Sequence, residues 1–177
     1  NLLVVKPSSS PLKEINRSVD FAAMVPMQVQ ESLSDSVTRN KISYIKQLII
    51  GGAAVSSTLE SALSAFPIRC FSTYGMTETV SHIALRELNT AYSGYKALGN
   101  ITFLQDDRGC LCIHAPHLSN TFFITNDIVW LSGKASFEWL GRFDNVINSG
   151  GVKLFPEEIE KKISELIPDK RDRKSVV

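Results

Sequence analysis

The sequence has 177 residues, 44% of them hydrophobic, which allows one domain with a sizeable core or a part of a larger protein. Lys and Arg number 19 against 18 Asp and Glu, so the formal net charge is +1. That balance argues against nucleic-acid binding, which requires a clustered excess of basic residues.

The first element that the sequence predicts is a short buried strand over Leu2–Val5, closed by Pro7. No signal peptide is visible in the sequence, and the chain begins with Asn1 rather than methionine, so we expect a part of a longer protein. No apolar run approaches the roughly 20 residues of a transmembrane helix, so no membrane span is expected.

The next segments predict two strands with a helix between them. Phe21–Val25 is an apolar run that Pro26 stops, and Met27–Val37 alternates polar and apolar residues in a pattern that suggests a helix. Ile45–Ile50 then reads as a second strand, which ends on two glycines. The oligomeric state stays open, a homo-oligomer included.

Ser56 and Ser57 offer an N-cap for a helix that follows this second strand. Apolar residues recur after them at helical spacing, and Pro67–Phe71 then reads as another strand. Strand, glycine turn, helix and strand form the βαβ pattern of a parallel sheet. Ligands of such sheets gather at the carboxyl ends of the strands, where Gly51-Gly52 and Tyr74-Gly75 would meet.

After Asn100 the pattern changes to short antiparallel strands. Ile101–Leu104 and Leu111–Ile113 flank a polar turn, and Val129–Leu131 and Phe137–Leu140 flank another. A helix is then expected from Pro156, because proline suits the first helical position and acidic residues follow it.

Cys110, Cys112 and His114 alternate, so on a strand they share one face. A metal site is one interpretation, and inward packing of small apolar thiols is the other. Structural zinc sites draw ligands mainly from turns with about two to four intervening residues, which favours packing. With Cys70, the three cysteines form no secreted-type disulfide framework and predict a reducing compartment, the cytoplasm.

The most informative cluster follows the strand at Pro67–Phe71 and packs a hydroxyl, a carboxylate and a glycine into six residues. It is Tyr74-Gly75-Met76-Thr77-Glu78-Thr79. Glu78 is a candidate Mg²⁺ ligand, because hard cations take oxygen donors, or else a carboxylate at a helix start. Thr77 could bond a phosphate oxygen or cap a helix. Tyr74 could stack on a base or be a core residue.

Four segments together resemble the adenylate-forming acyl-CoA synthetase superfamily, in order and spacing, over about 140 residues. They are Leu48–Ala54, Tyr74–Thr79, Thr125–Asp127 and Gly141–Gly151. In Thr125-Asn126-Asp127, Asn126 stands where the superfamily has glycine. Within the superfamily, three segments resemble the o-succinylbenzoate–CoA ligases of menaquinone biosynthesis: Met24–Gln28, Gly51–Ala54 and Asp144–Gly151.

The resemblance implies a nucleotide site for ATP or AMP. Its residues are Gly52, Ala53, Tyr74, Gly75, Met76, Thr77, Asp127 and Arg142, with Glu78 on Mg²⁺ and with Thr77 and Glu78 in the catalytic step. Asp127 accepts hydrogen bonds, as a ribose diol requires, and Arg142 donates them. An ion pair between Asp127 and Arg142 is the alternative.

The resemblance also implies a hinge, a coenzyme A channel and an acid-binding site. Asp144 matches the hinge residue, or else is an exposed turn aspartate, and Ser149, Gly150 and Gly151 match the channel. Candidates for the acid are Gly51, Ser81 and His82, although a lone histidine is more often a hydrogen-bonded structural residue.

We therefore expect an α/β protein in three parts of an adenylate-forming enzyme. Residues 1–99 would be the α/β part of the large domain, 100–143 a β subdomain, and 144–177 the hinge and the start of the small domain. The expected activity is ATP-dependent carboxylate–CoA ligation through an acyl-adenylate. Another acyl-CoA synthetase or an amino-acid adenylation domain is the alternative.

Two superfamily elements are absent from the sequence. No glycine-rich phosphate loop occurs between Asn1 and Ser43, and the superfamily's adenylation lysine would lie beyond Val177. This absence supports an interpretation of another class, a non-catalytic nucleotide-binding fragment.

Overall fold

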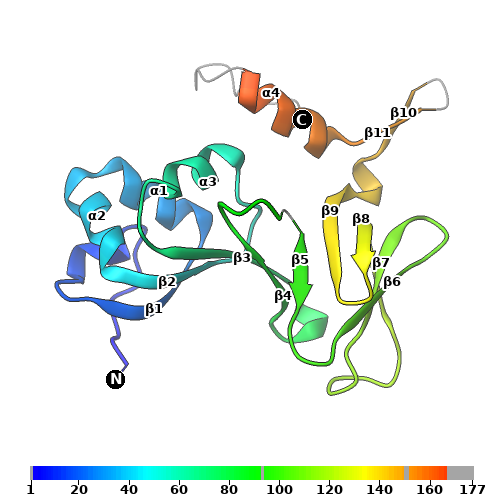
Figure 1. The fold of residues 1–177 in the computed structure, drawn as a ribbon, viewed down its shortest axis with the longest axis horizontal. Coiled ribbons are helices and arrows are strands. Elements are labelled where there is room, and N and C mark those ends of the chain that lie inside the picture. Colours follow the sequence, from blue (N-terminus) through cyan, green and yellow to red (C-terminus); the bar gives the residue numbers. More distant parts are fainter. Residues whose placement is uncertain (1, 93, 150–151, 167–177) are drawn as a thin grey trace.

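The computed structural model describes residues 2–92, 94–149 and 152–166 (Figure 1). Within them one nine-stranded sheet has the order β1-β2-β3-β4-β5-β9-β8-β7-β6. Its strands are β1 Val19–Met24, β2 Ile45–Ile50, β3 Arg69–Gly75, β4 His82–Glu87, β5 Tyr95–Ala97, β6 Thr102–Gln105, β7 Cys110–His114, β8 Phe123–Gly133 and β9 Ser136–Arg142. A separate hairpin pairs β10 Ile147–Ser149 with β11 Val152–Leu154.

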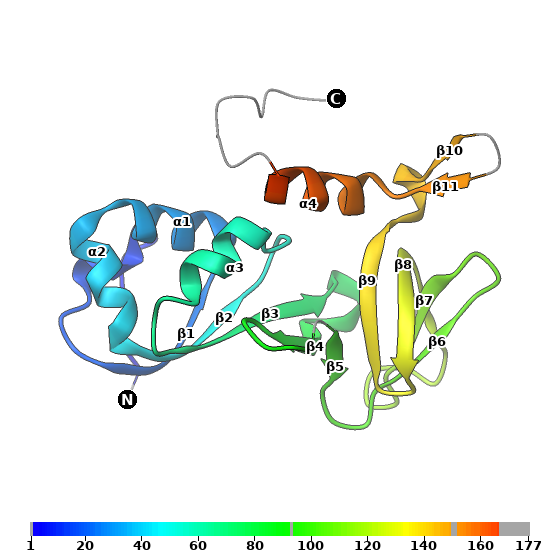
Figure 2. The same cartoon turned by 45° about the horizontal axis from the view of Figure 1, so that its top comes forward.

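Helices connect or flank these strands. They are α1 Pro26–Ser34, α2 Ser36–Lys41, α3 Ser57–Leu63 and α4 Pro156–Leu166, with 3₁₀ helices at Pro11–Glu14, Ile42–Tyr44, Thr77–Thr79 and Phe143–Asn145. In Figures 1 and 2, α1, α2 and α3 lie on the same side of β1, β2 and β3. No helix in the described residues is long and apolar enough to cross a membrane.

The predicted parallel unit is confirmed. β1, β2 and β3 are parallel neighbours, with Ala22, Leu48 and Cys70 in register across them. Ser56 caps α3 as expected, because its hydroxyl accepts a hydrogen bond from the Leu59 amide at 3.2 Å. Residue 35 divides the expected single helix into α1 and α2.

Two sequence predictions in this region are corrected. Asp35 has extended backbone angles and caps α2, accepting from the Val37 amide at 2.8 Å, so the helix from Met27 does not continue through it. The predicted strand Leu2–Val5 is wrong: the segment is not a strand, and Leu2 is 89% exposed. In the described residues β1 is the edge strand on that side, and the segment does not pair with its open edge.

The antiparallel part begins at β4, which pairs with β3, and the predicted hairpins β6–β7 and β8–β9 are both confirmed. The sequence reading missed β4 and β5. We predict a domain boundary between residues 99 and 100, but β5 lies before it and pairs with β9 after it, so one sheet includes strands from both sides. That division of the chain stays a prediction.

Two hydrophobic clusters hold the fold. One includes Ile50 and Leu63 and contains residues from β1, β2, β3, α1 and α3. The other includes Phe103 and Phe137, both fully buried, and lies in the antiparallel part. The polar residues at the end of β3 therefore lie where the two parts meet.

All three cysteines are free and buried. Burial raises the pKa of the Cys70 thiol to about 11. No cluster of three or more His, Cys, Asp or Glu residues suited to a metal occurs in the described part of the chain. Cys110 and Cys112 are 0% and 9% exposed, as inward packing expects.

Candidate functional site

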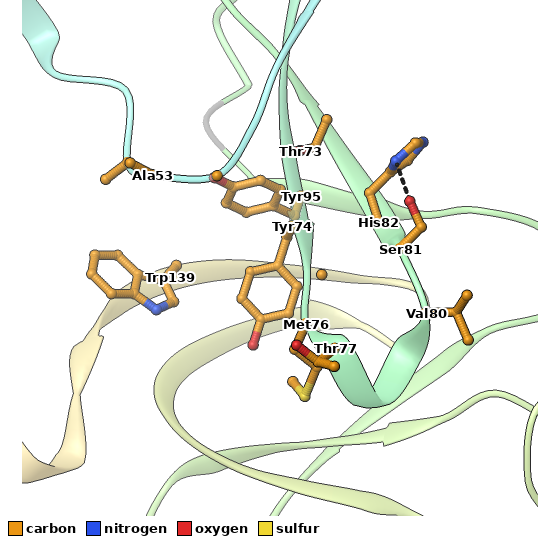
Figure 3. Close-up of a pocket in the computed structure, with 13 residues that line it drawn as sticks. Ala53, Thr73, Tyr74, Met76, Thr77, Val80, Ser81, His82, Tyr95 and Trp139 are labelled. Atoms are coloured by element: carbon orange, nitrogen blue, oxygen red, sulfur yellow. Dashed lines mark hydrogen bonds between the residues drawn. The ribbon is translucent and has the colours of Figure 1, made fainter. Parts of the chain in front are cut away.

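An open pocket of about 540 Å³ lies at the carboxyl ends of β2 and β3, where the parallel and antiparallel parts of the sheet meet (Figure 3). Its walls come from the β2–α3 loop, the end of β3 and the turn after it, the start of β4, and from β5 and β9. They comprise Gly52, Ala53, Ala54, Thr73, Tyr74, Gly75, Met76, Thr77, Val80, Ser81, His82, Tyr95 and Trp139. The pocket thus occupies the edge where ligands of parallel sheets gather.

The glycine turn after β2 forms one wall. Gly52 has φ +84°, a left-handed conformation that glycine adopts without strain. Gly51 lies against the Thr73 side chain, so that a larger residue would collide with it. This turn brings Ala53 to the pocket and confirms that the two glycine-containing segments meet at one edge of the sheet.

Tyr74, at the end of β3, both packs in the core and lines the pocket. Its ring meets Phe137 edge-on at 5.0 Å between centroids, and its hydroxyl donates to Asp127 Oδ2 at 2.5 Å. Burial, and next the Asp127 carboxylate, raise the pKa of the Tyr74 phenol well above its ordinary value. The phenol is therefore protonated at neutral pH and acts as a donor to the carboxylate.

Asp127 lies on β8 and is 9% exposed. Besides Tyr74, the indole N–H of Trp139 donates to its Oδ1 at 3.2 Å. Arg142, its register partner on β9, approaches the same oxygen at 3.6 Å. The ion pair that we gave as the alternative for Asp127 and Arg142 is therefore present. A carboxylate with donors on both oxygens is held in one orientation.

Arg142 connects this carboxylate with the candidate hinge residue. Its guanidinium donates to Asp144 Oδ2 at 3.3 Å, and the Asn126 amide donates to the same oxygen at 3.3 Å. Asp144 lies in the 3₁₀ helix Phe143–Asn145 and is exposed, as the turn-aspartate alternative expects. Its role as a hinge stays a prediction.

The turn after β3 is a 3₁₀ helix, held by Thr79. The Thr79 hydroxyl accepts from the Met76 amide at 3.0 Å and donates to the Ser81 carbonyl at 2.9 Å. Val80 follows with φ +65°, which costs energy in a β-branched residue. This turn directs Thr77 toward the pocket, and Thr79, rather than Thr77, makes the capping contacts.

Glu78 is exposed on the same turn and does not line the pocket. In the described part of the chain its carboxylate has no hydrogen-bond or ion-pair partner, so it is accessible to a ligand from solvent. Ser81 and His82 border the pocket and interact with each other, at 3.2 Å between Oγ and Nδ1. That contact agrees with a structural role for His82.

The structure brings eight predicted site residues together around the pocket: Gly52, Ala53, Tyr74, Gly75, Met76, Thr77, Ser81 and His82. Asp127 and Arg142 join them through Tyr74 and Trp139, and Gly51 joins them through Thr73. Ser149 is exposed on β10 and does not line it. Gly150 and Gly151 lie outside the described residues.

Five lining residues were not predicted as site residues: Ala54, Thr73, Val80, Tyr95 and Trp139. Trp139 could have been identified from its indole N–H, which usually needs an acceptor when it is buried. Asp127, a predicted acceptor, lies on the strand that pairs with that of Trp139. Tyr95 gave no such signal, since its short strand was not recognised.

Comparison with known proteins gives a consistent result. No protein-family model matches the chain. A solved acyl-CoA synthetase (AMP-forming)/AMP-acid ligase II-like protein from Dyadobacter fermentans is 39% identical with a TM-score of 0.75, covering 92% of this chain and 47% of that one. The resemblance to the adenylate-forming superfamily is confirmed. So is the α/β fold, as a part of such an enzyme.

The superfamily relatives include o-succinylbenzoate enzymes. A 2-succinylbenzoate–CoA ligase of Escherichia coli is 27% identical over 169 residues, which are 87% of this chain and 36% of that protein. A solved E. coli MenE with bound OSB-AMS is 25% identical with a TM-score of 0.68, and covers 90% of this chain and 37% of that one. The chain spans about a third to a half of the length of these relatives.

Proposed function

We propose that this chain carries the nucleotide half of the active site of an ATP-dependent carboxylate–CoA ligase. Such an enzyme forms an acyl-adenylate, releases pyrophosphate, and passes the acyl group to coenzyme A. The observation that carries the proposal is the Asp127 carboxylate, fixed by Tyr74 and Trp139 beside a pocket that the superfamily's signature residues line.

The pocket offers each part of AMP a suitable group. Tyr74 and the Ala53 backbone flank the space for the base, and the carboxylate of Asp127 has lone pairs left for ribose hydroxyls. Arg142, with its side chain 48% exposed, can donate to ribose or phosphate oxygens. Thr77 presents a hydroxyl for the phosphate.

Glu78 fits the Mg²⁺ that ATP chemistry requires. Mg²⁺ bound with phosphates takes one or two carboxylates and several waters, so a single exposed carboxylate without an internal partner is sufficient. Mg²⁺ supplies charge neutralisation at the phosphates.

We propose o-succinylbenzoate as the acid, near Gly51, Ser81 and His82. All six curated relatives that match are named as 2-succinylbenzoate–CoA ligases, two of them as probable. We also propose that residues 144–177 begin a small domain that turns about Asp144, with Ser149 beside the coenzyme A channel. The free cysteines support a reducing, cytoplasmic location.

The first test is pyrophosphate exchange into ATP with a panel of acids. We expect exchange with o-succinylbenzoate and at least tenfold less with benzoate, acetate or amino acids. Exchange only with an amino acid would favour an adenylation domain. Absence of exchange with every acid, in a protein that still binds AMP, would favour a non-catalytic nucleotide-binding fragment.

A second prediction concerns Glu78. In the full enzyme, replacing it with alanine should lower the adenylation rate about 100-fold, because the Mg²⁺ that neutralises transition-state charge at the α-phosphate loses a ligand. The Kd for ATP, measured by calorimetry, should change less than about threefold, since the pocket walls stay intact. Glu31→Ala, an exposed glutamate on α1, is the matched control. Equal losses in rate and affinity would make Glu78 a structural residue.

A further inference from the structure

Trp139 contacts the Asp127 carboxylate and also lines the pocket, and the proposed function gives it no role toward the nucleotide itself. Its indole N–H donates to Asp127 Oδ1 at 3.2 Å, while the Tyr74 hydroxyl donates to Oδ2 at 2.5 Å. Each carboxylate oxygen thus has one neutral donor, and the two donors come from different strands, β9 and β3. Together they fix the rotation of the carboxylate about its last side-chain bond.

The ring of Trp139 also forms a wall of the pocket. Figure 3 shows the rings of Trp139 and Tyr74 beside the same space, near Ala53. Trp139 is half-buried, so one part of the ring is packed and another is free to contact a ligand. Aromatic faces stack favourably on nucleobases.

We propose that Trp139 is a positioning residue for the nucleotide, which orients Asp127 toward the ribose hydroxyls and presents its ring to the base. This inference rests on the proposed function, since it needs an adenine nucleotide in the pocket. A carboxylate has about four lone-pair sites, and Tyr74 and Trp139 occupy one on each oxygen. Oδ2 keeps one site that suits a ribose hydroxyl, while Arg142 approaches the second site on Oδ1 at 3.6 Å.

The role of the indole N–H can be separated from that of the ring. Trp139→Phe keeps an aromatic ring but removes the donor, so Asp127 Oδ1 loses a partner and the carboxylate can rotate. We expect the Kd for AMP, measured by calorimetry, to rise about tenfold. The Kd for 2′,3′-dideoxy-AMP, which lacks both hydroxyls, should change less than threefold. The preference for AMP over the dideoxy nucleotide therefore falls.

Trp130→Phe is the matched control, because Trp130 lies on the paired strand β8 but is 67% exposed. It should leave both dissociation constants unchanged. If Trp139→Phe weakens both nucleotides equally, Trp139 is only structural and the proposal fails. If it changes neither, the proposal fails as well, while the proposed function stands.

A fluorescence titration tests the ring in the protein without altering Trp139. The chain has two tryptophans, so Trp130→Phe leaves Trp139 as the only indole. We expect AMP to quench its emission with the same Kd that calorimetry gives. Calorimetric binding without a change in emission overturns the stacking role alone. Absence of AMP binding to the wild-type chain overturns both the inference and the proposed function.

Discussion

Replacing Gly75 with alanine is expected to abolish nucleotide binding and to lower the free energy of unfolding by about 3 kcal/mol. A Cβ at Gly75 would lie 2.6 Å from His82 Cα and would also collide with the Ser81 backbone. These are backbone atoms of the opposing segment, so no side-chain rotation can relieve the clash. The end of β3 must move, and Tyr74 and the Thr77–Thr79 turn move with it.

Urea unfolding and AMP calorimetry measure the two effects of Gly75→Ala. Gly133→Ala is the control, because a Cβ at Gly133 has only the Ser136 hydroxyl near it, at 3.5 Å, which is an ordinary contact. Its free energy of unfolding should change by less than about 0.5 kcal/mol. A Gly75→Ala protein with wild-type stability would show that β3 and β4 can separate at no cost.

The elements that the sequence predicted correctly depend on residues close together in the chain. Ser56 caps α3 through its own hydroxyl, and Pro156 begins α4 because its fixed φ suits the first helical turn. The β6–β7 hairpin follows from a polar turn, in which Asp106 accepts from the Arg108 amide at 2.9 Å. The contacts of Ser56 and Asp106 join residues at most three positions apart, and the signal of Pro156 lies in its own ring.

The elements that the sequence missed depend on distant partners. β4 is a strand because it pairs with β3, and the three-residue β5 exists only between β4 and β9. Strand propensity is weak without such neighbours. The predicted strand Leu2–Val5 has a suitable composition, but the segment does not pair with the described sheet and Leu2 stays exposed.

In the candidate site too, the residues of a continuous motif could be predicted and the contacts between distant strands could not. The signature residues from Tyr74 to Thr77 could be recognised by their order in the chain. The hydrogen bonds of Tyr74 and Trp139 to the Asp127 carboxylate, which we call the carboxylate clamp, could not be recognised in this way. Tyr74 and Asp127 are 53 positions apart, and Trp139 reaches Asp127 only through the pairing of β8 with β9. The pairing of β8 with β9 brings Trp139 to the carboxylate, and the fold of the sheet brings Tyr74 from β3, so no motif joins the two donors.

Replacing Asp127 with asparagine is expected to weaken AMP binding about 100-fold while lowering the free energy of unfolding by only about 1 kcal/mol. The amide oxygen can accept from the Trp139 N–H, and the amide N–H₂ can donate to the Tyr74 oxygen, because a phenol can also accept. Both internal contacts therefore survive. The ribose hydroxyls, by contrast, lose a charged acceptor.

Alanine at the same position should be worse for the fold. Asp127→Ala leaves the Trp139 N–H and the Tyr74 O–H without their acceptor, which should lower the free energy of unfolding by about 2–3 kcal/mol. Asp107→Asn, at an exposed aspartate in the β6–β7 turn, is the control and should change neither stability nor binding. Equal affinity for AMP in Asp127→Asn and the wild type would remove Asp127 from the ribose site.

The pKa of Tyr74 gives an independent readout of the same substitution. The Asp127 carboxylate helps to raise that pKa, so Asp127→Asn should lower it, although burial, the larger cause, keeps it above its ordinary value of about 10. Alkaline titration followed by tyrosinate absorbance measures the shift. Since a phenol that ionises less readily in the folded state destabilises the fold as pH rises above about 10, the wild type should lose more stability there than Asp127→Asn. An unchanged Tyr74 titration would mean that the carboxylate does not control the phenol, and the clamp would then not hold the nucleotide site in one arrangement.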